Sequence, residues 1–178
     1  DVRKCQTVIG ELLWLSTRTR PDLSFAVSYL GSRVTKCPKR VLKLAHHVVG
    51  YLMNTLDYAL AYKPCSEEMD SYGRQCSMSR LEVLADSSFA PTGGKGHQGI
   101  MCLWGGALVA WESKTQPFAT LSTTECELLG YVDGLTLGES VGAIVNVLEQ
   151  NALAHEGCYV LRGDNLSGLQ LLHAPSGP

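Results

Sequence analysis

The spacing of apolar residues changes from a helical period to a strand period at about residue 81, and this change limits the fold more than any other feature. Before it, apolar side chains recur every three or four residues over 6–15, 22–34 and 39–54, which predicts three helices. A short β-like run follows over 55–62. The N-terminal part of the chain is therefore expected to be mainly helical.

The second part of the chain has a pattern of strands followed by a long helix. Short apolar runs predict strands over 81–86, 97–105 and 107–113, and the glycine-rich turns between them favour an antiparallel meander. Helical spacing then continues from Ser122 to about Asn151.

A fourth strand over 158–164 and a closing helix near Asn165 complete the predicted elements. Because a helix separates the fourth strand from the meander, this strand is free to pair in parallel with the first. The order defines a mixed α/β fold preceded by a small helical segment. Residues 64–80 are polar and lack periodicity, so they are predicted to link a first unit at 1–63 to a second at 81–178.

Composition indicates a folded protein inside the cell. Hydrophobic residues make up 45% of the 178 residues, which is enough to bury a core. The sequence lacks a run of about eighteen apolar residues and a signal-peptide pattern, so neither a membrane partner nor export is expected. The seven cysteines are scattered without a Cys-x-x-Cys pair, which argues against a disulfide framework or a zinc site.

Charge is distributed unevenly along the chain. Residues 1–63 carry ten Lys or Arg against four Asp or Glu, whereas residues 64–178 carry five against thirteen. A basic segment beside an acidic one is typical of a nucleic-acid-binding arm joined to a carboxylate metal site. Two solvated surfaces of opposite sign explain the same counts, so charge alone leaves both interpretations open.

Three acidic residues stand where the predicted fold would gather them. Asp86 ends the first strand, Asp164 ends the fourth, and Glu127 lies in the first turns of the long helix. Because the ends of neighbouring parallel strands meet, the two aspartates are expected about 5 Å apart. Close carboxylates repel one another unless a proton or cation neutralises them, and oxygen ligands suit Mg²⁺ or Mn²⁺. The alternative is that Asp86 and Asp164 only form turns.

Glu125 and Glu127 have different predicted roles. Ser122 lies three residues before Glu125 and just ahead of an apolar helical run, which is the arrangement of a capping box. Glu127 points about 200° around the helix from Glu125 and has no capping duty. Glu127 is therefore the better candidate ligand.

Two regions of the sequence match a known pattern. The second region holds "LADSSFA" and "AWESKTQPFATLSTTECEL", with its run of Trp, Ser-Lys, Gln-Pro, Leu-Ser and Thr-Glu-x-Glu. It resembles the ribonuclease H part of copia-type LTR retrotransposon polyproteins. The first region, with "IGELLWLSTRTRPDLSFAVSYL" and "VVGYLMNTLDYALAY", resembles the stretch of the same Pol polyprotein that follows the reverse transcriptase catalytic core. The polymerase motif Tyr-x-Asp-Asp does not occur in the sequence.

The resemblance implies an RNase H-like fold at 81–178, with a mixed five-stranded-type sheet, and a reverse transcriptase thumb or connection remnant at 1–63. It implies that Asp86, Glu127 and Asp164 are catalytic and hold two Mg²⁺ or Mn²⁺ ions. The implied reaction is endonucleolytic hydrolysis of the RNA strand of an RNA–DNA hybrid. The implied setting is the reverse transcriptase polyprotein, in the cytoplasm within a virus-like particle or in the nucleus.

Polar residues near the predicted site are expected to contact the phosphates and 2′-hydroxyls of the hybrid. The candidates are Lys95, His97, Gln98, Ser122 and Thr123. Further candidates for phosphate contacts lie in the first unit: Lys36, Lys39, Arg40 and Lys43. Each of these residues is also compatible with an ordinary solvated position.

Departures from the family pattern favour a second hypothesis, a catalytically inactive remnant of a decayed retroelement that only binds nucleic acid. The family's first motif usually reads Asp-Ala-Asp-Trp, whereas this chain has "DSSF" at 86–89. Family members usually continue to a further carboxylate and a His. A third hypothesis, an unrelated metal-dependent phosphatase, would need a phosphate-binding loop, and "PTGGKG" lacks the spacing of a P-loop.

Overall fold

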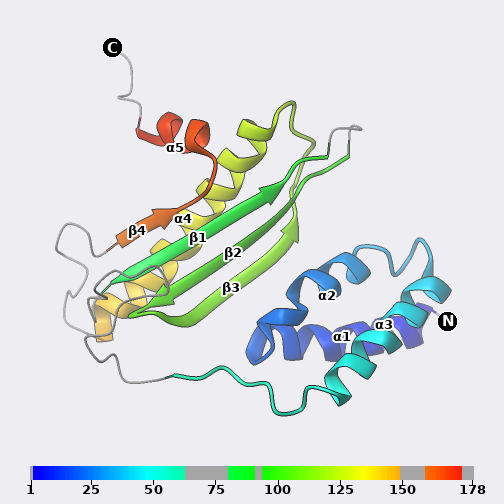
Figure 1. Ribbon diagram of the computed structural model, residues 1–178. Helices are drawn as coiled ribbons and strands as arrows, with labels where there is room; N and C mark the ends of the chain where they lie inside the picture. The colour runs from blue at the N-terminus through cyan, green and yellow to red at the C-terminus, as the bar shows by residue number, and fades with distance from the viewer. Residues whose placement is uncertain (1, 63–79, 91–93, 149–158, 174–178) are drawn as a thin grey trace. The chain divides into compact units, whose positions relative to one another are not determined.

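The computed structural model describes residues 2–62, 80–90, 94–148 and 159–173. These residues fold into two compact units, one helical and one of mixed α/β structure (Figure 1). Of the predicted linker at 64–80, all but Arg80 lies outside the described residues.

The helical unit contains three α-helices and a short 3-10 helix. These are α1 (Val2–Arg18), η1 (Pro21–Leu23), α2 (Ser24–Gly31) and α3 (Pro38–Met53). Buried side chains from all three α-helices form its core: Cys5, Ile9, Leu12, Val27, Leu30, Val41 and Ala45. The helices predicted from apolar spacing are confirmed. Pro21 begins η1, where its missing N–H removes no helical hydrogen bond.

The β-like run predicted over 55–62 forms no strand, so that prediction was wrong. Thr55 at its start instead contacts the buried guanidinium of Arg20, which donates to the backbone oxygen of Thr55 at 3.0 Å and to its Oγ1 at 2.8 Å. The same group pairs with Asp22 at 2.8 Å and lies 5.6 Å from the ring centroid of Tyr58. The run thus contributes Thr55 and Tyr58 to the surroundings of a buried arginine, while Leu56 and Tyr62 are exposed.

The α/β unit combines a four-stranded mixed sheet with two helices. In chain order these are β1 (Leu81–Ser88), β2 (His97–Trp104), β3 (Ala107–Thr115), α4 (Thr123–Leu148), β4 (Tyr159–Arg162) and α5 (Leu166–His173). The strand order is β3-β2-β1-β4, with β1 antiparallel to β2 and parallel to β4 (Figure 1). The predicted parallel pairing of the first and fourth strands is confirmed. The described residues contribute four strands, whereas the resemblance implied a five-stranded-type sheet.

Gly105 and Gly106 connect β2 to β3 with φ values of 54° and 81°. Two successive residues in the left-handed region define a tight hairpin turn, which glycine adopts without steric strain. The glycine pair therefore forms the turn that the sequence predicts, and it keeps β2 and β3 adjacent in the sheet.

Helix α4 packs closely along β1 because its buried face is made largely of glycine. The glycines recur every four residues: Gly130, Gly134, Gly138 and Gly142. A Cβ added at Gly134 would lie 3.2 Å from the side chains of both Val83 and Ala85. By length and composition alone, α4 is apolar enough to cross a membrane. In the structure its glycine-rich face packs against β1, as a core helix does, while Ile144, Val147 and Leu148 near its end are exposed.

Candidate metal centre

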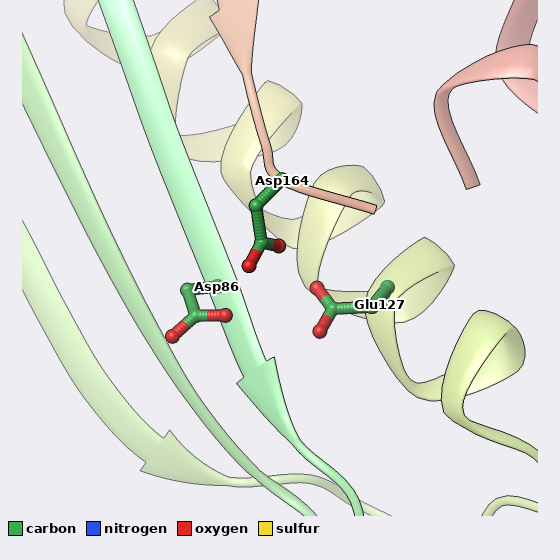
Figure 2. A group of neighbouring side chains, drawn as sticks. All are labelled: Asp86, Glu127 and Asp164. Atoms are coloured by element: carbon green, nitrogen blue, oxygen red, sulfur yellow. The ribbon is translucent and has the colours of Figure 1, made fainter. Parts of the chain in front are cut away.

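Three carboxylates from different elements meet beside the sheet. Asp86 lies on β1, Glu127 on the second turn of α4, and Asp164 two residues past the end of β4. One oxygen from each lies within 4.8 Å of the others, and the three groups point toward one another (Figure 2). Asp86 and Asp164 are exposed, whereas Glu127 is buried. The structure thus brings together the three acidic residues that the order of elements singles out.

The strand register explains why the two aspartates meet. The last paired residues of the parallel strands β1 and β4 are Leu84 and Arg162. Asp86 and Asp164 each follow two residues later, so they continue the two strands on the same side of the pleat. An open groove of about 610 Å³ includes both aspartates and is otherwise lined mainly by apolar residues, among them Leu84, Met101, Val160, Leu161 and Leu169.

A cluster of three charged side chains links strand β1 to strand β4. The carboxylate of Glu82 on β1 lies 2.7 Å from Nε of Arg162 on β4 and 3.1 Å from Nε of Arg80. These side chains are largely shielded from water, so their attraction is screened less than at the surface. Sequence reasoning missed this group. Its available signal was a pair of opposite charges inside two otherwise apolar strands.

The surroundings of Glu127 disfavour its charged form. The residue is 7% exposed, and its Oε2 is buried without a hydrogen-bond partner. Burial, and then the charges of Asp86 and Asp164, raise the pKa of Glu127 to about 7, although a backbone hydrogen bond with Ser87 opposes the shift. A divalent cation among the three groups would offset both effects. Because hard oxygen donors suit Mg²⁺ and Mn²⁺, these residues fit the expected metal.

A capping arrangement fixes the start of α4, one turn before Glu127. The Oγ of Ser122 accepts a hydrogen bond from the backbone N–H of Glu125 at 3.1 Å, as the capping box predicts. The carboxylate of Glu125 accepts from the N–H of Leu121 at 2.6 Å, one residue earlier than predicted. Glu125 is therefore occupied in capping the helix, which separates its role from that of Glu127.

The buried side chain of Gln116 ties the residues before α4 to the helix. Its Nε2 donates to the backbone oxygen of Cys126 at 2.8 Å, and its Oε1 accepts from the Cys126 thiol at 3.2 Å. Its own N–H donates to the backbone oxygen of Gly96 at 2.8 Å. Because Glu127 follows Cys126, Gln116 fixes the turn that carries the carboxylate. Sequence reasoning missed this role, although the Gln-Pro pair in the matched motif was an available signal.

The five predicted nucleic-acid contacts do not share one environment. Four of them are at least partly exposed: Lys95, His97, Ser122 and Thr123. Gln98 is 1% exposed, and its amide donates to the carboxylate of Asp133. Because Gln98 is buried and its amide is bonded to Asp133, it is not a surface contact for nucleic acid, and this prediction is corrected.

Sequence comparison relates the chain to transposon proteins. A protein assigned to transposon Ty5-1 in Saccharomyces cerevisiae is 32% identical over 117 residues, which are 64% of this chain and 34% of that protein. The retrovirus-related Pol polyprotein from transposon TNT 1-94 of Nicotiana tabacum is 24% identical over 165 residues, 93% of this chain and 11% of the polyprotein. An uncharacterized mitochondrial protein of Arabidopsis thaliana is 26% identical over 129 residues, 71% of this chain and 49% of that protein.

These matches give the chain a retroelement origin. Over 93% of its length the chain is similar to the retrovirus-related Pol polyprotein from transposon TNT 1-94. The chain spans half or less of the length of each of these relatives. No protein-family model matches the chain, and no solved structure matches it.

Proposed function

We propose that the α/β unit is an RNase H-like domain that hydrolyses the RNA strand of RNA–DNA hybrids during reverse transcription, together with the rest of a retroelement polyprotein. The observation that carries the proposal is the cluster of Asp86, Glu127 and Asp164, whose oxygens lie within 4.8 Å. The mixed sheet with its long covering helix is compatible with this fold. Homology to a Pol polyprotein supports a setting in which such hybrids arise.

The three carboxylates have complementary roles as metal ligands. Asp86 and Asp164 offer exposed oxygens from two strands that the Glu82–Arg162 pair holds together. Glu127 adds an oxygen from the helix, and its unpartnered Oε2 is buried at the same place. Two divalent ions bound there would activate a water molecule and stabilise the leaving oxygen of a phosphodiester.

Donors for the substrate backbone lie close to the carboxylates. His97 pairs with Ser88 in the register of β1 and β2, two residues beyond Asp86. Ser122 and Thr123 stand at the beginning of α4, and the N-terminus of a helix favours phosphate. Such contacts hold a nucleic acid through its backbone, without reading its sequence.

Helix α3 offers a second surface for phosphate in the helical unit. Lys39, Arg40 and Lys43 are exposed, while Val41 and Ala45 between and after them are buried in the core. The helix contains no acidic residue to neutralise these charges. Replacing the three basic residues with Gln should weaken hybrid binding and flatten its dependence on salt, because fewer counterions are released. A titration at several salt concentrations measures this.

The alternative is an inactive remnant that binds hybrids without cutting them. Ser88 stands at the place where the resembled motif has a second acidic residue, and its position is exposed. The metal cluster found among the described residues therefore contains three carboxylates, without a fourth from this motif. If catalysis requires the fourth ligand, binding would survive and cleavage would not.

A cleavage assay separates the two functions. The chain is incubated with a hybrid labelled on the RNA strand, in Mg²⁺, Mn²⁺ or EDTA, beside an Asp86→Asn variant and duplexes of RNA or DNA alone. The proposal predicts metal-dependent cutting of the RNA strand of the hybrid only, lost in the variant. Hybrid binding without cutting in either metal would establish the inactive alternative.

A further inference from the structure

Tyr131 connects the helix that carries Glu127 to the segment that carries Asp164. It lies on α4 one helical turn after Glu127, and it is 0% exposed. Its Oη accepts a hydrogen bond of 3.1 Å from the backbone N–H of Asn165. Asn165 directly follows Asp164, so one side chain of α4 reaches the segment that carries the third carboxylate.

Two glycines enclose the ring of Tyr131. A Cβ added to Gly163 would contact the Cε1 and Oη atoms of the ring, and one added to Gly168 would lie 2.8 Å from Cε2. Positive φ values occur at Gly105 and Gly106 among the described glycines, and not at these two. Gly163 and Gly168 are therefore needed for the space they leave to the ring, rather than for an unusual backbone conformation.

Asn165, the residue after Asp164, also starts helix α5. The Oδ1 of Asn165 accepts from the N–H of Gly168 at 2.9 Å, and its backbone oxygen accepts from the N–H of Leu169 at 3.1 Å. Asn165 thus uses its side chain and carbonyl to start the helix, and its N–H to bind Tyr131. Asp164 stands between Gly163 and Asn165, and both of these neighbours touch the tyrosine.

We propose that Tyr131 is a positioning residue for the metal centre, holding Asp164 at a fixed separation from Glu127. This inference rests on the proposed function and deepens it. Charged carboxylates that share a site repel each other, and Asp164 lies on a connection beyond the last paired residue of β4. Tyr131 and Glu127 share one rigid helix, so the hydrogen bond to Asn165 ties the two ligands together.

Mn²⁺ binding to the whole chain tests this role, with Tyr131→Phe set against a matched variant, Tyr159→Phe. Tyr159 likewise links α4 to the β4 segment, although its hydroxyl donates, to the backbone oxygen of Leu135 at 3.0 Å. It lies at the opposite end of β4 from Asp164, since its pairing partner is Leu81. Each change removes one hydroxyl that links α4 to the β4 segment, and each leaves the aromatic ring in place.

Tyr131→Phe is expected to weaken Mn²⁺ binding about tenfold or more, as for other residues that orient metal ligands. Tyr159→Phe is expected to leave the Mn²⁺ affinity unchanged. It should lower the melting temperature by about as much as Tyr131→Phe does. Equal Mn²⁺ affinities for wild type and Tyr131→Phe would overturn the positioning role alone. If the wild type shows no Mn²⁺ binding that Asp86→Asn removes, the metal centre itself fails, and the positioning role fails with it.

Discussion

Nε of Arg162 on β4 lies 2.7 Å from Oε2 of Glu82 on β1, and this pair joins the two strands from which Asp164 and Asp86 extend. Strands β1 and β4 share only four pairs of residues in the register, so few backbone contacts hold their ends in line. The charged pair therefore contributes to the geometry of the carboxylates as well as to the sheet.

Replacing Arg162 with Met should lower both stability and metal affinity. Glu82 would keep Arg80 but lose its link to β4, at a cost on the order of 2 kcal/mol, below the full loss for a buried charge left unpaired. Mn²⁺ affinity should fall about tenfold, because Asp164 would be held less firmly.

Arg80→Met is the matched control for this variant. Arg80 lies two residues from Glu82 in the chain, so its pair joins no second strand. Thermal unfolding and calorimetric titration of both variants measure the difference. Equal losses of Mn²⁺ affinity in the two variants would show that the link between strands has no role at the site.

Gly138→Ala should destabilise the α/β unit although alanine favours helices. The added Cβ would lie 2.5 Å from Cγ2 of Val83 and would also contact Tyr159, so helix and sheet must separate. The expected loss is about 1–3 kcal/mol, as for other overpacked cores.

Gly10→Ala in α1 is the contrasting change. Beyond its own helical turn, no atom lies within 4 Å of its added Cβ, so it should stabilise its helix by up to about 1 kcal/mol. Chemical denaturation measures the free energy of unfolding of each variant. An increase in this free energy for Gly138→Ala would refute close packing of α4 on β1.

Much of the α/β unit could be predicted because each element has its own local signal. The glycine pair at 105–106 marks the hairpin, and Ser122 with Glu125 marks the start of α4. Parallel pairing of the first and fourth strands followed from the helix between them. That topology then placed Asp86 and Asp164 together before any distance was known.

The remaining features depend on contacts between residues far apart in the sequence. The run at 55–62 resembles a strand in composition, but it forms none, and its first residue, Thr55, accepts hydrogen bonds from the buried Arg20. Gln98 has the residue type of a surface donor, yet its place on β2 buries it against Asp133. A local pattern reports the conformation that a segment favours by itself, and it does not report which partner the fold supplies.

The raised pKa of Glu127 makes stability depend on pH in the metal-free protein. The folded state holds the proton of this carboxyl up to about pH 7, whereas the ordinary value is 4.5. Its contribution is therefore fully present below about pH 4.5 and is lost as the pH rises to about 7. In EDTA, the melting temperature of the wild type should fall across this window relative to that of Glu127→Gln. Parallel curves for the two proteins would contradict the raised pKa.

Glu127 and the two aspartates are proposed to carry out metal-dependent cleavage together, and the neighbouring Glu125 provides the sharpest comparison. Glu127→Gln removes a ligand, while Glu125→Gln changes a helix cap two residues away. The measurement is the rate of RNA-strand cleavage in a labelled hybrid with Mg²⁺ for wild type and both variants. We expect a loss of at least about 100-fold for Glu127→Gln, since even outer partners of a metal ligand contribute about 10–100-fold, and little change for Glu125→Gln. Equal rates for Glu127→Gln and the wild type would contradict it.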